Sequence, residues 1–418
     1  MSYALLIIIF ALGYTAIIFE HVLKINKSAV AIFMAVACWA VFFLGSSHSF
    51  SENIEHLNVN VSGVAQIIFF LLGAMAIVEL IDSHQGFKVV TDAIHTSSKR
   101  KMLWLIAGAT FFLSSILDNL TTTILMISLL RKLITDPKDR LLLCCIVVVA
   151  ANAGGAWTPI GDVTTTMLWI NGQLTSLAVI KALFTPSLLS ALVPLAYFSF
   201  RMKGRIAPAP LEKKGVEEPG ARLVFILGVL GLVCVPVFKA LTGLPPFMGI
   251  LISLSILWLV TDGIHHAHEQ RRHLRVPYIL TKIDISGVLF FLGILLCVGS
   301  LEAASVLKDL ATWLGNHLQS HAALATYIGL FSAVVDNVPL VAATMGMYPL
   351  EIFPPDHPLW HMIAYAAGTG GSILIIGSSS GVALMGMEKI DFMTYMKKVS
   401  LPVLVGYLIG MVSYIGLS

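Results

Sequence analysis

Two short polar stretches that share one pattern interrupt an otherwise apolar sequence. Residues 114–119 (the first tip) read SSILDN, and residues 332–337 (the second tip) read SAVVDN. Each has a serine followed four residues later by an Asp-Asn pair. A carboxylate at membrane depth costs about 2.5–3.5 kcal/mol on insertion scales, and such residues mark ion pathways. Asp118 and Asp336 are therefore the first candidates for binding a transported cation.

The oxygen atoms around the first aspartate suit a hard cation. Asp118 supplies a charged oxygen and Asn119 a neutral amide oxygen, while Ser114 and Thr121 add hydroxyls. Hard cations such as Na⁺ and Li⁺ prefer oxygen ligands, with a carboxylate to offset the charge. The alternative is that Asp118 only caps the following helix. Because a solvent-exposed cap would not explain a carboxylate at membrane depth, we expect a cation site here.

A glycine-rich break follows each tip. Residues 152–162 (the first break) read NAGGAWTPIGD, and the same spacing of two glycines, five residues and a third glycine returns at 370–377. Glycine and proline disfavour a continuous helix, and unwound segments expose carbonyls that coordinate cations in transporters. The candidate ligands in and just after the first break are Asn152, Gly154, Thr158, Asp162 and Thr164. The alternative is a proline kink whose polar neighbours satisfy freed backbone groups, and for Asp162 that alternative stays open.

The second half of the chain repeats this set of ligands with one change. Its candidates are Ser332, Asp336, Asn337, Thr369, Ser372 and Ser378. Ser378 stands at the place that corresponds to Asp162, so the break at 369–378 (the second break) carries no carboxylate. We therefore expect two unequal sites, one of which binds the cation more weakly or handles protons.

The composition is typical of a helical membrane protein. Of the 418 residues, 57% are hydrophobic and 12% are charged, whereas a soluble protein carries about 25% charged residues. Five cysteines in apolar stretches, without disulfide or metal spacing, predict buried free thiols. The absence of a phosphate-binding loop argues against ATP drive, and we expect no cofactor and no nucleic-acid partner.

The apolar runs divide the chain into two similar halves. We expect membrane segments at 3–19, 29–44, 61–81, 141–180 and 188–200, and again at 223–239, 247–260, 285–301, 360–396 and 401–415. The tips lie between short arms at 102–117 and 120–134, and at 324–335 and 338–348. Arms of about fifteen residues are too short to cross a core of about 30 Å twice, so we predict a re-entrant helical hairpin in each half.

The number of crossings predicts the topology. Each half has five crossings, an odd number, so the second half is expected to be inverted relative to the first. With the N-terminus outside, 23 of the 26 Lys and Arg residues fall in inside segments, as the positive-inside rule requires. We predict an all-α polytopic membrane protein with inverted repeats at 1–203 and 222–418. A cytoplasmic linker at 204–221 joins them, and both termini lie outside.

Two further polar groups have open readings. Glu79, Asp82 and Glu302 lie toward the ends of the third span of each half. They are either groups of a proton path or interfacial carboxylates in reach of water, and the sequence does not distinguish the two roles. The histidine-rich loop at 265–273 lacks the spacing of a zinc site. A solvated basic loop is the favoured reading, and a pH-sensing role is the alternative.

Over nearly its full length the chain resembles an NhaD-type sodium/proton antiporter of the ion transporter superfamily. The most specific segments are SSILDNLTTT, NAGGAWTPIGD, SAVVDNVPL and GTGGSILIIGSSSG. Dicarboxylate and citrate carriers of that superfamily have a serine where this chain has Asp118 and Asp336, and this difference favours a cation as the sole substrate. The resemblance implies an elevator-like or gating motion, a homodimer, and a place among the lipids of the bacterial inner (plasma) membrane.

These features predict a secondary active antiporter, and no enzymatic activity. Asp118 and Asp336, helped by Asp162, would hold either Na⁺ (or Li⁺) or protons, so that the proton gradient expels sodium. One rival is an intramembrane enzyme with paired aspartates, although an Asp-Asn pair in a re-entrant tip suits transport better. The other is a sodium-coupled carboxylate or oxyanion carrier on the same scaffold, whose anion donors would be Asn119, Thr121, Asn337 and Thr369.

Overall fold

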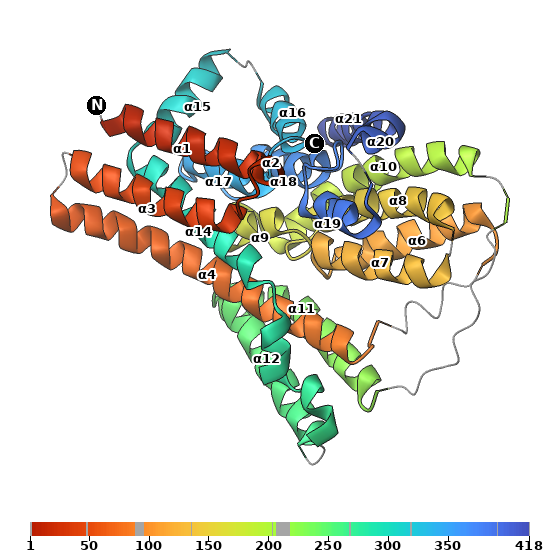
Figure 1. The fold of residues 1–418 in the computed structure, drawn as a ribbon. Helices are drawn as coiled ribbons and strands as arrows, with labels where there is room; N and C mark the ends of the chain where they lie inside the picture. Colours follow the sequence, from red (N-terminus) through yellow and green to blue (C-terminus); the bar gives the residue numbers. More distant parts are fainter. Residues whose placement is uncertain are drawn as a thin grey trace.

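The computed structural model describes residues 2–46, 49–87, 96–134, 136–202, 204–205, 218–266, 269–317, 320–390 and 392–417. Within these residues every regular element is a helix (Figure 1). Seven of the described helical segments are long and apolar enough to cross a membrane. The chain is therefore an all-helical, multi-pass membrane protein, as the sequence predicts. Most of the expected linker, at 206–217, and residues 267–268 of the histidine-rich loop lie outside the described residues.

The helices follow the expected order along the chain. Those of the first half are α1 (Ser2–Ile18), α2 (Glu20–Leu23), α3 (Lys27–Gly45), α4 (Phe50–Ser83), α6 (Lys99–Ser114), α7 (Asn119–Leu133), α8 (Pro137–Ala156), α9 (Val163–Ile170) and α10 (Ser176–Arg201). Those of the second half are α11 (Ala221–Thr242), α12 (Pro246–His265), α13 (Val276–Ile279), α14 (Ile285–Ala303), α15 (Val306–His317), α16 (His321–Ser332), α17 (Asn337–Met347), α18 (Pro358–Gly370), α19 (Ser379–Glu388), α20 (Phe392–Tyr395) and α21 (Leu401–Leu417). The described residues also include two short 3₁₀ helices, η1 (Glu269–Leu274) and η2 (Leu280–Lys282), and a short π-helix, η3 (Met396–Ser400).

The helices form two groups, each drawn from both halves of the sequence. In one group α3 packs on α1 and α14, and α4 packs on α12 and α14. In the other, α8 lies between α6 and α7, while α10 packs on α21 and α16 on α18. The groups meet where α9 contacts α4 and where α17 contacts α14 (Figure 1). Both tips and both breaks belong to the second group, close to this junction.

Helix α4 is longer than the sequence suggested. We expected a span at 61–81, but the helix covers 34 residues from Phe50 to Ser83. At about 1.5 Å per residue it is roughly 50 Å long, well beyond a hydrocarbon core of about 30 Å. Its polar beginning is helical because Ser49 and Glu52 form a reciprocal capping box. The expected boundary was wrong because hydropathy detects the apolar part of a helix and misses a capped polar extension.

The segment after the first break also differs from the expectation. We placed the end of the broken segment at 180 and a separate helix at 188–200, but α10 is one helix of 26 residues. Pro186 and Pro194 lie inside it, and such prolines are tolerated in membrane helices because neighbouring groups satisfy the freed carbonyls. The residues 392–417 likewise form one continuous span of 26 residues.

Two smaller features also differ from the sequence analysis. Cys234 is exposed on α11, whereas Cys38, Cys144, Cys145 and Cys297 are buried free thiols as predicted. An apolar run alone does not distinguish the packed face of a membrane helix from its outer face. Helix α15 was not expected, because its polar sequence falls below the hydropathy of a span.

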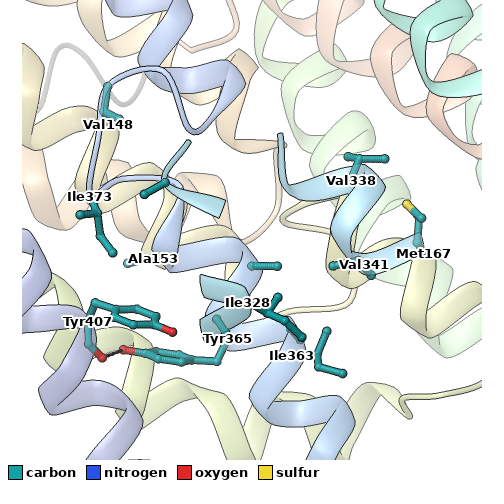
Figure 2. Packing of buried hydrophobic residues seen from close by; sticks show 14 of the residues in the cluster. Val148, Ala153, Met167, Ile328, Val338, Val341, Ile363, Tyr365, Ile373 and Tyr407 are labelled. Carbon is teal, nitrogen blue, oxygen red and sulfur yellow. Dashed lines mark hydrogen bonds between the residues drawn. The ribbon is translucent and has the colours of Figure 1, made fainter. Parts of the chain in front are cut away.

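The core is continuous across the two halves. Met167 of α9 lies beside Val338 and Val341 of α17 (Figure 2). The rings of Tyr365 and Tyr407 stack with centroids 5.8 Å apart, and the Tyr365 hydroxyl donates to the Tyr407 carbonyl at 2.8 Å. The site described next is therefore held in a packed interior and not on a surface loop.

Candidate cation site

Each tip is a sharp connection between two helices that an aspartate caps. Helix α6 ends at Ser114 and α7 begins at Asn119, and Asp118 Oδ1 accepts a hydrogen bond from the Thr121 amide at 2.8 Å. The Thr121 hydroxyl donates to the other oxygen, Asp118 Oδ2. Asp336 caps α17 in the same way, accepting from the Val338 amide at 3.2 Å. Both aspartates therefore cap a helix, and each carboxylate lies half-buried against a cavity.

The two breaks are also built alike. Helix α8 ends at Ala156 and α9 begins at Val163, while α18 ends at Gly370 and α19 begins at Ser379. A Cβ on Gly154 would collide with the backbone of Phe111 in α6, and one on Gly370 would collide with the backbone of Gly329 in α16. Glycine at these two positions therefore lets each broken helix touch the arm that precedes its tip.

Matching serine hydroxyls hold the tips against the breaks. Ser114 Oγ donates to the Ala151 carbonyl at 2.6 Å, and Ser332 Oγ donates to the Ala367 carbonyl at 3.0 Å. Each alanine lies three residues before the glycine that permits the close approach. The two halves therefore repeat a specific contact as well as a sequence pattern, and both serines position the site.

Two more expected ligands also make structural hydrogen bonds. Thr158 Oγ1 donates to the Ser115 carbonyl of the first tip at 2.6 Å. Thr369 Oγ1 donates to the Tyr365 carbonyl one turn earlier in its own helix, also at 2.6 Å. These hydroxyl protons are committed to the backbone, which leaves the oxygen lone pairs as the groups that a cation would use.

A buried amide connects the two halves at the centre. Asn119 Nδ2 donates to Asn152 Oδ1 at 3.0 Å. Asn152 Nδ2 then donates to Ser372 Oγ and Ser378 Oγ, each at 2.9 Å. These four predicted residues come from α7, α8 and both sides of the second break, and all are buried. Asn337 is buried at the start of α17.

Asp162 is the most buried of the predicted carboxylates. Its residue is 2% exposed, and it caps α9 by accepting from the Thr164 amide at 3.3 Å through Oδ1. Asp162 Oδ2 lies against Gly368 of α18, and no described residue donates a hydrogen bond to it. Asp118 and Asp336 both lie near enough for their charges to act on Asp162. Asp162 is thus within electrostatic range of both tip aspartates, which line separate cavities.

Several hydroxyl oxygens of the same elements share this lack of partners. Within the described residues, the buried side-chain oxygens without a hydrogen bond include those of Thr122, Thr123, Thr164, Thr165 and Ser380. Buried polar atoms without partners are costly, and clusters of them indicate an ion or ordered water. Among the described residues, no three His, Cys, Asp or Glu side chains lie together as a group that could hold a metal ion. The unpartnered donors are carboxylate and hydroxyl oxygens, the type that hard cations prefer.

The two tips open onto separate cavities. Asp118, Asn119 and Thr121 line one cavity of about 360 Å³, whose other walls are largely apolar side chains of α4 and α14. Asp336 and Ser378 line a smaller one of about 90 Å³. Asp118 and Asp336 therefore do not share a cavity, which sequence symmetry alone could not indicate.

The sequence does not single out Lys27, which lines both cavities together with Ser379 and Val382. It is the first residue of α3, and its Nζ lies 3.8 Å from Asp336 Oδ2. In the sequence it counts only as one of the charges of the inside segments. Its position directly after the helix cap Asn26 was the available signal, because a basic residue is unfavourable at a helix N-terminus.

The structure also shows where the polar groups lie whose roles the sequence leaves open. Asp82 and Glu302 are exposed at helix ends, and Glu79 pairs with Lys282 at 3.6 Å. His265 is buried, with its Nε2 3.0 Å from Nε2 of His84, so the histidine-rich loop does not begin in solvent as expected. Burial also lowers the pKa of His84.

Comparison with known proteins places the chain in a family. A family model described as citrate transporter (CitMHS) matches residues 14–360. Sodium/proton antiporter 1 of Arabidopsis thaliana is 52% identical over 413 residues, which cover 98% of this chain and 71% of that protein. Sodium/proton antiporter 2 of the same plant is 50% identical over 414 residues, covering 98% of each. The Na⁺/H⁺ antiporter NhaD of Vibrio cholerae is 30% identical over 448 aligned positions, covering 99% and 91%.

The tips, breaks and buried carboxylates therefore belong to a transport protein. The chain is a member of the citrate transporter family and, within it, of the NhaD-type transporters.

Proposed function

We propose that this protein exchanges Na⁺ or Li⁺ for protons across the membrane, with both cations competing for the same carboxylates. The observation that carries this proposal is Asp162, a buried carboxylate with one oxygen that no described residue satisfies. Asp118 and Asp336 act on it with charges of the same sign. The names of the relatives from Arabidopsis thaliana and Vibrio cholerae support the same exchange.

Burial gives the physical basis for coupling. A carboxylate removed from water is stabilised by either a proton or a metal cation, and a carboxylate as buried as Asp162 cannot remain ionised without a cation at low cost. Sodium uptake and proton release are then two aspects of one exchange at this carboxylate. The proton gradient expels sodium if the carrier changes access only when one of them is bound.

We further propose that residues 1–203 and 222–418 are inverted repeats of five crossings each, joined by a linker at 204–221. The equivalent bonds of Ser114 and Ser332 support the repeat, and the distribution of Lys and Arg supports both termini lying outside. A homodimer surrounded by lipid completes this proposal. Location in a bacterial inner membrane stays a prediction, because the two relatives that are 52% and 50% identical to this chain come from a plant.

The test is a transport assay in inside-out membrane vesicles with a pH-sensitive dye. Addition of NaCl or LiCl should dissipate an imposed proton gradient with the wild-type protein, and KCl should not. Asp118→Asn should abolish the response while the protein still inserts, because an amide cannot exchange a proton for Na⁺. Wild-type activity in both Asp118→Asn and Asp336→Asn would contradict the proposal.

The family description favours one rival, a carrier of citrate or a related anion. Such a carrier needs hydrogen-bond donors for the substrate carboxylates, whereas the half-buried Asp118 and Asp336 would repel them. The same vesicles distinguish the two functions. Citrate-dependent uptake without a response to Na⁺ alone would establish the rival and reject the exchange.

A further inference from the structure

Lys27 lies between the two cavities that contain the tip aspartates. Its side chain lines the cavity of Asp118 and also that of Asp336. The ammonium Nζ is 3.8 Å from Asp336 Oδ2 and 4.4 Å from the centre of the Phe290 ring. The lysine is therefore held by a carboxylate on one side and by an aromatic face on the other.

The helix that carries Lys27 does not account for its charge. Lys27 is the first residue of α3, where the helix dipole is positive and a cation is disfavoured. Its backbone amide donates to Glu20 Oε1 at 3.2 Å, which leaves the ammonium available for Asp336. Local helix stability therefore does not explain why the Lys27 ammonium lies here, whereas its pairing with Asp336 does.

The charged groups around Lys27 come from several elements and are otherwise acidic. Asp118 of the first tip and Asp284, which caps α14, line the larger cavity. Glu20 of α2 and Asp336 line the smaller one, together with Tyr14 of α1. Among the described residues that line these two cavities, Lys27 carries the one cationic side chain.

We propose that the Lys27 ammonium is an internal counter-ion of Asp336, which competes with the transported cation for that carboxylate. A cation brought to Asp336 meets a like charge within about 4 Å, so the lysine weakens its binding. Lys27 thereby sets the range of sodium concentration over which the second tip works. This inference rests on the proposed function.

The experiment measures sodium-dependent proton exchange by purified protein in liposomes, over a range of pH. The variants are Lys27→Gln, Lys27→Arg and the matched control Lys24→Gln, which removes a charge from an exposed residue of the same connection. At alkaline pH, where the carboxylates are ionised, Lys27→Gln should lower the KM for Na⁺ by roughly three- to fivefold, the size expected for a partly exposed ion pair. Lys27→Arg, which keeps the charge, and Lys24→Gln should match the wild type.

The rate at saturating Na⁺ gives a second readout. Because the proposal concerns binding at Asp336, kcat should stay at the wild-type value in Lys27→Gln while the KM for Na⁺ falls. An unchanged KM, or a fall in kcat at unchanged KM, would overturn the inference. If the glutamine variant does not fold, Lys27→Met, which retains an apolar stem against Phe290, takes its place under the same criteria. Failure of the wild type to exchange Na⁺ would instead reject the proposed function.

Discussion

At the scale of single residues, the chemistry depends on oxygen atoms that the protein leaves without donors. Asp162 Oδ1 caps a helix, but Oδ2 has no described donor. The Asn152 amide, in contrast, is fully used in bridging Asn119 to Ser372 and Ser378. Under the proposed function, the unsatisfied oxygens are the groups expected to bind the cation, and the satisfied amides hold the surrounding elements in place.

Replacing Asp162 with asparagine tests this division. Asp162→Asn should reduce Na⁺/H⁺ exchange at least about 100-fold, because the neutral amide keeps the size of the side chain but has no charge to offset Na⁺ and takes up no proton. Its thermal stability in detergent should equal or exceed that of the wild type, because a buried charge is removed. Asp309→Asn, an exposed aspartate of α15, is the matched control. Normal exchange by Asp162→Asn would show that this carboxylate is only a cap.

The residue types of the site could be predicted from the sequence, but their partners could not. The repeated tip pattern identified Asp118 and Asp336. The alignment of the two breaks identified Asp162 and, at the corresponding position of the second break, Ser378. The bridge from Asn152 to the second break and the pairing of Lys27 with Asp336 span more than 200 residues. Such contacts depend on how the halves pack, which local spacing does not encode.

At the scale of elements, an ion-pair cluster ties the two broken helices together away from the site. Glu388 at the end of α19 accepts from Arg131 Nε at 2.8 Å and from Arg140 Nε at 3.0 Å. Its side chain is 3% exposed. The cluster therefore fixes the end of α19 against α7 and the start of α8.

Removing the charge of Glu388 should loosen this attachment. Glu388→Gln leaves two arginines facing a neutral amide, and we expect it to destabilise the protein by about 1–3 kcal/mol. Thermal unfolding in detergent should show a lower Tm for Glu388→Gln, with Glu351→Gln, an exposed residue, unchanged. Equal Tm values for the two variants would show that the cluster contributes nothing to stability.

The paired histidines of α4 and α12 predict a pH dependence of stability. Burial lowers the pKa of His84, against the opposing effects of the Leu80 carbonyl and Glu218, and His273 lowers it further. A histidine with a lowered pKa stabilises the fold above its unfolded pKa of about 6.5, and this contribution is lost as the pH falls below that value.

The drop in Tm between about pH 7.5 and about pH 5.5 should therefore be smaller in His84→Gln than in the wild type. His266→Gln, which changes the exposed neighbour of His265, serves as the control and should retain the wild-type drop. A wild-type drop in His84→Gln would assign the pH dependence to other groups.

Helix boundaries agree with the prediction where the length of an apolar run sets them, and they differ where a polar cap or an internal proline is involved. The hairpin arms and the breaks lie close to their expected positions, because Asp, Gly and Pro mark the boundaries. Helix α4 extends beyond its apolar part because of a capping box, and α10 continues through two prolines. Neither effect is visible to a hydropathy window.

At the scale of the whole molecule, the two halves supply equivalent parts whose polar side chains differ. The first half contributes Asp162 and the second half Ser378 at the matching position, and each caps the second part of its broken helix. Lys27 adds a further asymmetry, because it pairs with the second tip and not with the first. A repeated framework with unequal ligands suits a carrier in which one site exchanges ions and the other adjusts its affinity.

The most direct test of this account is calorimetric measurement of Na⁺ binding to the purified protein as a function of pH. If sodium and protons compete for the same carboxylates, the apparent Kd for Na⁺ should rise about tenfold for each pH unit on the acid side, and Na⁺ binding should release protons. Asp162→Asn should lose both effects. A Kd independent of pH, with no proton release, would contradict competitive binding as the basis of exchange.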